Sequence, residues 1–293
     1  GASGSALEPP SVPDVPDIIR FWYQDRNIRD LVALKKAVCR MDRNPEQRAL
    51  KTALSAAARD SMLTYRGEVR LRRLVEKDLA RFRADSIRLF HKRSGLLVDR
   101  IPCLPKEPCP RVSTGDVRAI PLGDGECHTI VCSPPYADDK NGVGYFQFSR
   151  NMLYWIGHGL EDIALAKARF LGGIVTGRKP TALLVSRTLS LCLESVAERN
   201  GRHYQEALAF YADYFSALRE MLRVVRSRVI IVIGNRVLSR TFFDNARITV
   251  EMAESLGSTF EHYYARTILK KRIPNLGGDG GGGDIEHVIV LKK

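Results

Sequence analysis

The sequence predicts a protein of the α/β class, in which a doubly wound sheet with an antiparallel edge follows a separate basic helical domain. Three observations lead to this prediction. Apolar residues in the first third recur at helical spacing, several prolines then interrupt the chain, and short β-branched runs alternate with longer helical patterns from residue 112 onward. The chain has 293 residues, of which 44% are hydrophobic, so it can bury a sizeable core.

The first 17 residues are expected to form a tag or linker and then an extended lead-in. Residues 1–5 resemble an expression linker, and four prolines between residues 8 and 17 favour extended backbone. Residues 18–93 follow as the helical domain, in which Asp42 or Asn44 before Pro45 is the candidate start of a helix.

The helical domain carries most of the positive charge. Residues 18–93 contain 20 Lys and Arg against 9 Asp and Glu, which gives +11 of the formal net charge of +13. A solvated helix face is the ordinary explanation of a charge run, but this asymmetry favours contact with nucleic acid. The candidate contact residues lie where the cations are densest, and they are Arg66, Arg70, Arg72, Arg73 and Lys77.

Residues 94–111 form a predicted proline-rich linker, because four prolines there prevent a continuous helix. The rest of the chain, residues 112–293, is expected to form the sheet. A β-branched run predicts a buried strand over 127–132. The further expected elements are helices within 145–222 around a loop at 172–180, a strand at 229–233, a helix at 241–256, and strands at 259–269 and 287–291.

Ser133, Pro134, Pro135 and Tyr136 directly follow the first of these strands. Ligands of open α/β sheets bind at this carboxyl end of the strands. The two prolines stiffen the loop and remove two N–H donors. The Ser133 hydroxyl and the Pro134 carbonyl could therefore accept both protons of an exocyclic amine, and Tyr136 could stack on a flat base. The alternative is a rigid strand-to-loop turn without a chemical role.

This motif resembles the signature of the amino-methyltransferases, in which Asp, Asn or Ser precedes Pro-Pro-Tyr. The resemblance implies a Rossmann-like methyltransferase sheet and methyl transfer from S-adenosylmethionine to an exocyclic amine of a flipped DNA base. N4 of cytosine is preferred, N6 of adenine is second, and an RNA amine is third. It assigns Ser133, Pro134, Pro135 and Tyr136 as catalytic. Asp116 then becomes a candidate acceptor for the adenine amine of the cofactor, which Ser133 would also contact; a polar turn is the alternative.

Other segments resemble further parts of the same family, so that the resemblance covers roughly residues 18–293. Among them is an aromatic-Trp-Ile-Gly pattern, whose Trp155 is expected to be a core residue rather than a base-stacking one. The remaining segments are the helical insert at 61–74, the helix and strand of the family's eighth motif at 214–235, and the last two strands within 272–292.

The sequence departs from the family where the cofactor should bind. No glycine-rich turn after a first strand, and no acidic residue ending a second strand, is visible before Asp116. The glycine cluster at 277–283 precedes a strand rather than a helix, so we expect a hairpin loop there, natural or engineered. The chain thus resembles the target-base half of a methyltransferase, either naturally split over two polypeptides, which we favour, or truncated, or a non-catalytic DNA-binding relative.

The expected partners follow from this departure and from the charge. They are double-stranded DNA and a small protein subunit that carries the glycine turn and pairs with the open sheet edge. The longest apolar run, 229–233, is too short for a bilayer, so no membrane is expected. Six cysteines without a CxxC pair or a compact Cys/His cluster argue against bound metal, and Cys132 is expected to pack rather than react. We expect a cytoplasmic, DNA-associated prokaryotic protein.

Overall fold

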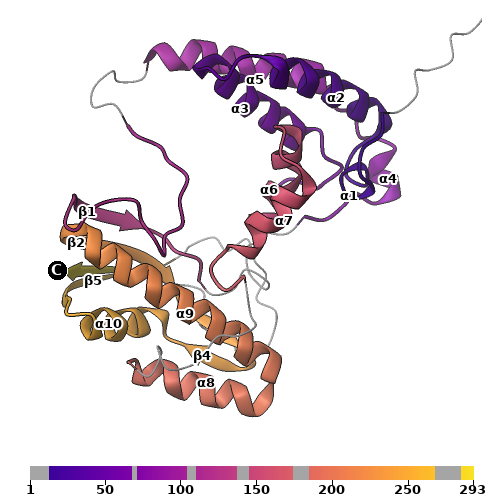
Figure 1. Cartoon of the computed structure of the whole chain (residues 1–293). Helices are drawn as coiled ribbons and strands as arrows, with labels where there is room; N and C mark the ends of the chain where they lie inside the picture. The colour runs from indigo at the N-terminus through magenta and orange to yellow at the C-terminus, as the bar shows by residue number, and fades with distance from the viewer. Residues whose placement is uncertain (1–12, 68–70, 104–109, 137–144, 174–184, 268–284) are drawn as a thin grey trace, which may run out of the picture. The chain divides into compact units, whose positions relative to one another are not determined.

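The computed structural model describes residues 13–67, 71–103, 110–136, 145–173, 185–267 and 285–293. The chain divides into two compact units, whose elements are labelled in Figure 1. Unit 1 consists of residues 1–110 and 144–164, and unit 2 of residues 111–143 and 165–293. The first boundary falls at the end of the proline-rich segment. Residues 144–164 belong to unit 1, whereas the sequence pattern assigned them to the later part of the chain.

Unit 1 is built from helices, of which α2, α3 and α5 lie side by side (Figure 1). Helix α6, which follows more than forty residues later in the chain, packs against α3. The helices of this unit are α1 (Asp17–Arg20), α2 (Asp25–Arg40), α3 (Pro45–Asp60), α4 (Glu76–Leu79), α5 (Ser86–Arg100), the 3₁₀ turn Ile101–Cys103 and α6 (Tyr145–Trp155), and α7 (Leu160–Ala168) crosses into unit 2.

Two sequence expectations are confirmed in unit 1. Asn44 is the N-cap of α3, where its side chain accepts a hydrogen bond from the Gln47 amide at 2.7 Å and Pro45 occupies the first helical turn. Trp155 is a core residue with no exposed surface, and it packs edge-on against Tyr23 with ring centroids 5.5 Å apart. The core of this unit therefore joins residues that are far apart in the sequence.

Residues 18–93 were expected to be helical, but the described residues 61–67 and 71–75 are not. This segment turns back on itself through an isolated bridge between Thr64 and Arg73, and Gly67 adopts a φ of 78°, which a helix does not allow. The Ser61 hydroxyl also bonds the Ala57 carbonyl at 2.8 Å, at the point where α3 ends. Tertiary pairing thus overrides the helical propensity of this basic stretch.

Unit 2 contains a four-stranded mixed sheet in the order β1-β2-β6-β5, which agrees with the predicted α/β class. β1 and β2 are parallel, while β6 pairs antiparallel with β2 and β5, as expected for an antiparallel edge. The strands are β1 (Cys127–Cys132), β2 (Val225–Gly234), β5 (Thr259–Thr267) and β6 (Ile285–Lys292), and the helices are α8 (Arg187–Arg199), α9 (Gly201–Val224) and α10 (Asn245–Ser255).

The core of unit 2 lies on one face of this sheet. Side chains of α9 and α10 pack there against alternate residues of the two central strands: Val229, Ile231 and Ile233 of β2, and Ile289 and Leu291 of β6. Residues with these spacings share a face because side chains alternate along a strand. No helix in the described part of the chain is both long and apolar enough to cross a membrane.

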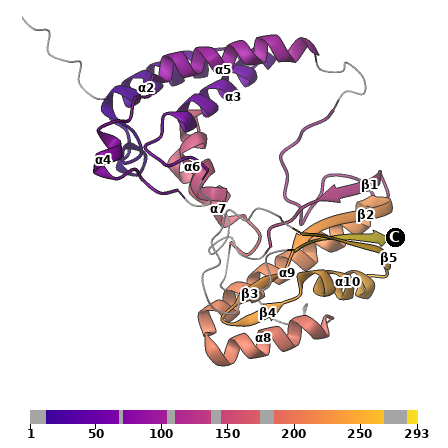
Figure 2. The same ribbon diagram turned by 180° about the vertical axis from the view of Figure 1, so that it is seen from behind.

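Two expectations for unit 2 were wrong. β1 was predicted to be buried, but it is an edge strand with a single neighbour among the described strands, and Val131 is 70% exposed. A helix was predicted over 241–256, but β3 (Arg236–Leu238) and β4 (Thr241–Phe243) form a hairpin before α10, as Figure 2 shows. Asp244 starts α10 by accepting a hydrogen bond from the Arg247 amide at 3.1 Å. The glycine cluster at 277–283 lies outside the described residues.

Candidate functional site

The Ser-Pro-Pro-Tyr loop leaves the carboxyl end of β1 and lies next to the carboxyl end of the parallel strand β2. Cys132 pairs with Ile231, so the loop continues alongside the last residues of β2. The ring of Tyr136 packs directly on Gly234: a Cβ at that glycine would lie 2.9 Å from two ring carbons. Any side chain at Gly234 would therefore displace Tyr136, which explains why β2 ends in glycine.

The hydroxyl of Tyr136 is held by β6, the strand next to β2. It donates a hydrogen bond to Glu286 Oε1 at 3.2 Å, and it lies 3.4 Å from the Ser133 hydroxyl. Glu286 stands near the start of β6 and forms an ion pair with Arg266 of β5. Tyr136 is thus oriented by contacts from β2 and β6 as well as from its own loop.

A buried asparagine that the sequence did not single out ties this loop to the rest of the unit. Asn245, the first residue of α10, is 1% exposed. Its Nδ2 donates to the Gly234 carbonyl at 2.8 Å and to the Tyr136 carbonyl at 3.4 Å. Its Oδ1 accepts from the Tyr211 hydroxyl at 2.5 Å, and burial raises the pKa of that hydroxyl, which stays a neutral donor.

The loop is partly exposed to solvent. Ser133 and Pro135 are exposed, while Pro134 and Tyr136 are half-buried. The preceding residue, Cys132, packs inward instead, with its Sγ 3.7 Å from Met221 Sδ. Burial raises the pKa of Cys132 to about 11, so this thiol is neutral near pH 7 and unsuited to nucleophilic attack. The arrangement can therefore accept hydrogen bonds from a bound amine, and it offers no thiolate beside it.

Asp116, the candidate acceptor for the cofactor adenine, is already engaged by Arg118. Its carboxylate accepts from the Arg118 amide at 2.9 Å, from Nε at 2.9 Å and from Nη2 at 2.7 Å. These hydrogen bonds lower the pKa of Asp116 to about 2. Arg118 in turn pairs with buried Asp213 of α9 at 2.9 Å. An adenine amine would have to share this carboxylate with a guanidinium.

The described residues do not complete a site for S-adenosylmethionine. β1 is followed by the Ser-Pro-Pro-Tyr loop and β2 by Gly234 and Asn235, so no glycine-rich turn follows either parallel strand in the described part of unit 2. The described residues also contain no cluster of three or more His, Cys, Asp or Glu side chains that could hold a metal ion.

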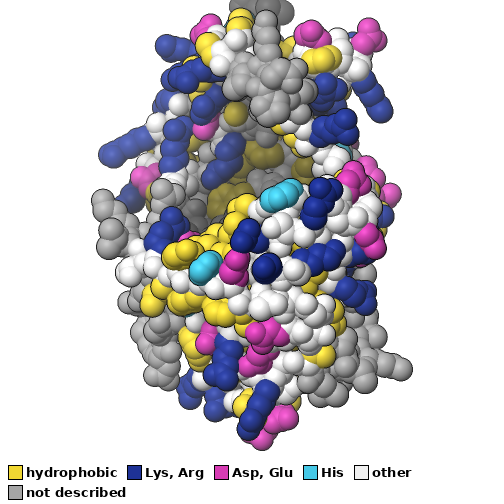
Figure 3. Space-filling model, turned by 90° about the vertical axis from the view of Figure 1, so that its left-hand side faces the viewer, with side chains coloured by type: hydrophobic (Ala, Val, Ile, Leu, Met, Phe, Trp, Pro, Cys, Tyr) yellow, Lys and Arg dark blue, Asp and Glu magenta, His cyan; other side chains and the backbone are white. Residues whose placement is uncertain are grey.

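The candidate nucleic-acid contacts of unit 1 gather in the loop 61–75 and the short helix after it. Arg66, Arg72, Arg73 and Lys77 are all exposed, whereas Arg70 lies outside the described residues. The Arg72 guanidinium lies 4.4 Å from the centroid of the Tyr65 ring, and that of Arg73 lies 4.7 Å from the centroid of the Phe21 ring. The loop thus combines exposed cations with aromatic rings. Lys and Arg side chains are also spread over the face seen in Figure 3, with exposed hydrophobic side chains between them.

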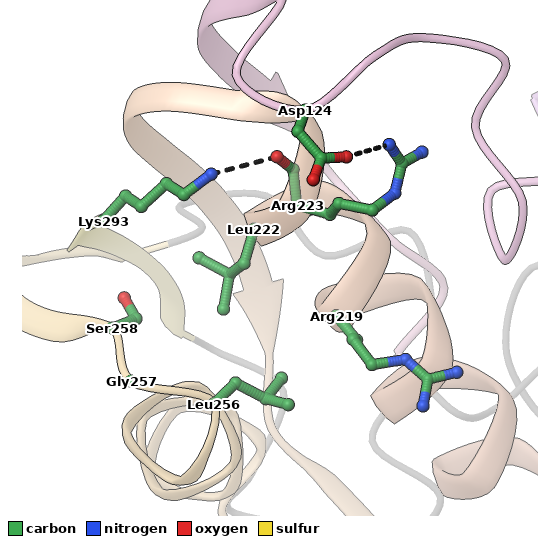
Figure 4. Close-up of a pocket in the computed structure, with 8 residues that line it drawn as sticks. All are labelled: Asp124, Arg219, Leu222, Arg223, Leu256, Gly257, Ser258 and Lys293. Atoms are coloured by element: carbon green, nitrogen blue, oxygen red, sulfur yellow. Dashed lines mark hydrogen bonds and ion pairs between the residues drawn. The ribbon is translucent and has the colours of Figure 1, made fainter.

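A separate pocket of about 290 Å³ lies at the other end of the sheet (Figure 4). It is close to the start of β2 and the end of β6, where Lys293 Nζ donates to the Arg223 carbonyl at 3.0 Å. Arg223 is itself paired with Asp124 at 2.7 Å and Glu220 at 2.8 Å. Because the motif loop leaves the carboxyl end of β1, this pocket is not part of its site. The lining residues are Asp124, Arg219, Leu222, Arg223, Leu256, Gly257, Ser258 and Lys293.

Comparison with known proteins agrees with the resemblance of the motif to methyltransferases. No protein-family model matches the chain. Over 157 residues, however, the chain is 26% identical to the type II methyltransferase M.MvaI of Kocuria varians. The chain is a distant relative of a type II methyltransferase. The match covers 50% of this chain and 34% of that methyltransferase, so the chain spans about a third of its relative's length.

A solved structure also matches, but the structural similarity is low. It is a protein of Thermus thermophilus with a provisional assignment as a DNA modification methylase, 17% identical to this chain. The match covers 61% of this chain and 50% of that protein, with a TM-score of 0.31. A TM-score this low carries no argument about fold or function, so the methyltransferase relationship depends on the sequence match.

Proposed function

We propose that this chain is the target-base half of a DNA amino-methyltransferase, which transfers a methyl group from S-adenosylmethionine to an exocyclic amine of a flipped base. N4 of cytosine is the preferred target and N6 of adenine the second. The observation that carries this proposal is the anchored Ser133–Tyr136 loop at the carboxyl end of β1, where ligands of α/β sheets bind.

The role of the loop is to bind and orient the amine. The Ser133 hydroxyl and the Pro134 carbonyl accept hydrogen bonds from the two N–H groups of the amine, which favours a nitrogen lone pair out of conjugation with the ring. Because prolines lack an N–H, no backbone donor of Pro134 or Pro135 competes for these acceptors. One face of the Tyr136 ring stacks on the flipped base while the other face rests on Gly234. Catalysis by this chain is thus mainly positioning.

We assign the methyl donor's site to a small protein subunit. S-adenosylmethionine is the donor implied by the methyltransferase relationship, and the described residues lack a turn that would hold its methionine part. Among the described strands, β1 has an open edge next to the motif, and its Val131 is 70% exposed. A strand of the subunit that pairs with β1 would cover this edge and bring its own loops to the carboxyl end of the sheet.

A second candidate function is a non-catalytic DNA-binding subunit, which the charge of unit 1 favours. An RNA amino-methyltransferase is the third. Both functions would use the same basic surface, so only the chemistry of the Ser133–Tyr136 loop distinguishes them from the proposed DNA methyltransferase. A DNA-binding subunit without activity has no need of the Ser133 hydroxyl, and an RNA enzyme would leave DNA unmodified.

The test compares Ser133→Ala and Tyr136→Phe with the wild-type chain, each co-expressed with the proposed small subunit. Ser133→Ala removes one acceptor, so we expect a loss of methyl transfer of about 10- to 100-fold. Tyr136→Phe keeps the ring and loses the hydroxyl contacts with Glu286 and Ser133, so a smaller loss is expected. Nucleoside mass spectrometry identifies the product. Unchanged transfer by Ser133→Ala, or 5-methylcytosine as the product, would refute the proposal.

A further inference from the structure

The β3–β4 hairpin contains the most unusual backbone in the described part of the chain. Ser239 and Arg240 form its two-residue turn with φ values of 50° and 63°, and among the described residues they are the non-glycine residues with positive φ. A turn of this kind favours Asn-Gly, because the left-handed region costs free energy for residues with a bulkier side chain. Ser-Arg is therefore a poor local choice for this turn.

Neighbouring helices hold the strained turn in place. Arg199 at the end of α8 donates to the Ser239 carbonyl at 3.1 Å, and His203 Nδ1 in α9 shares a hydrogen bond with the Ser239 hydroxyl at 2.7 Å. The Ser195 and Thr241 hydroxyls are bonded at 2.9 Å. These hydrogen bonds keep the turn in its strained conformation. Backbone strain that the surrounding structure maintains in this way is often found at functional sites.

The hairpin presents a cation and an aromatic ring to solvent. Leu238 and Phe243 point into the core with 3% and 1% exposure, whereas Arg240 is exposed at the tip and Phe242 is 49% exposed. Figure 2 shows the hairpin beside α8. A rigid hairpin with an outward arginine and an outward ring suits contact with a sugar-phosphate backbone and an unstacked base.

The position of the hairpin connects it to the motif. It joins Gly234 to Asn245, the two residues that contact the ring and the carbonyl of Tyr136. We propose that the β3–β4 hairpin is a nucleic-acid contact of the target-base site, in which Arg240 binds the backbone beside the target nucleotide and Phe242 packs on a base. This rests on the proposed function. Asn-Gly would make the same turn at lower cost but would lack the arginine.

The test exchanges the turn for its favoured sequence. The double variant Ser239→Asn/Arg240→Gly should fold at least as well as wild type and raise the Tm by a few degrees. Its affinity for a fluorescent duplex in low salt should fall about fivefold, and the slope of log K against log salt should decrease by about 1. Phe242→Ala should weaken binding to a duplex with an unpaired base more than to a fully paired one.

A matched arginine provides the control. Arg219 is exposed on α9 and lines the pocket at the far end of the sheet (Figure 4), so Arg219→Ala removes the same charge away from the motif and should change affinity less than Arg240→Ala. Equal affinities of wild type and the Asn-Gly variant, with wild-type binding intact, would overturn the hairpin contact alone. Absence of any binding by wild type would overturn both this contact and the proposed function.

Discussion

The two loops that carry candidate function differ in how they are held. In unit 1, the cations of the loop 61–75 lie over rings that are themselves near the surface: Phe21, beneath Arg73, is 52% exposed. In unit 2, the loop 133–136 is tied down by a buried asparagine, a glycine and a glutamate. Binding through exposed charged side chains tolerates small displacements of those side chains. A reaction at a single atom, in contrast, requires the groups that hold the substrate to be fixed in position. Substitutions should therefore have graded effects in the first loop and steep effects in the second.

The largest effect is expected for Gly234→Ala. The new Cβ would lie 2.9 Å from the Tyr136 ring, so the ring has to move from the position that Glu286 and Asn245 define. A displacement of about 1 Å at a positioning group can cost about 100-fold in rate, and we expect a loss of methyl transfer of that size. Gly201→Ala is the matched control, because a Cβ at that residue meets no atom within 4 Å. Equal activity of both variants would show that the ring position does not matter.

The next largest effect concerns the stability of unit 2. Arg118→Ala leaves the carboxylate of Asp213 buried at 1% exposure without its guanidinium, which should lower the free energy of unfolding by about 3 kcal/mol. Arg228→Ala removes an arginine from the more exposed pair with Glu261, where solvent screens the charges, and should lower the free energy of unfolding far less. Urea titrations of the two variants measure the difference, and similar losses would show that the buried pair of Arg118 and Asp213 contributes no more than the exposed one.

The contact between Arg118 and Asp116 predicts that the stability of unit 2 depends on pH. Hydrogen bonds from Arg118 lower the pKa of Asp116 from 3.8 to about 2. The stabilisation from this carboxylate is therefore fully present above pH 4 and is lost as the pH falls through 2. Asp116→Asn should be less stable than wild type at pH 5, and the difference should shrink as the pH falls from 4 to 2. A difference that stays constant over this range would argue against the contact.

A smaller and graded effect is expected in unit 1. Replacing Arg72 and Arg73 together by Ala should weaken duplex binding about tenfold at low salt, equally for all sequences, and reduce the salt slope by about 2. Methyl transfer at saturating DNA should stay unchanged, because neither residue belongs to the motif loop. A changed sequence preference would mean that these arginines contact bases rather than phosphates.

The sequence predicted those elements that have a strong local signal. The β-branched runs at 127–132 and 229–233 are strands, and Asn44 before Pro45 begins a helix. The hairpin at 236–243 was missed because Ser239 and Arg240 lack the glycine or asparagine that marks such a turn. Its strain is offset by hydrogen bonds from α8 and α9, which no local pattern reveals.

The site was predictable only in part for the same reason. The Ser-Pro-Pro-Tyr motif is contiguous, so it is visible in the sequence. Asn245 and Glu286 lie more than 100 residues away from it, and their roles depend on the meeting of α10 and β6 with the loop. A polar residue beside the helix-capping Asp244, directly after a strand, is the signal that could have drawn attention to Asn245.

The central proposal is a division of labour, in which this chain holds the base and a second subunit holds most of the cofactor. Isothermal titration of S-adenosylmethionine into the isolated chain, and into its complex with the subunit, tests it most directly. We predict weak or no binding by the chain alone and one-to-one binding by the complex, together with DNA methylation. Tight one-to-one binding by the isolated chain would contradict the claim, because its own residues would then suffice for the cofactor.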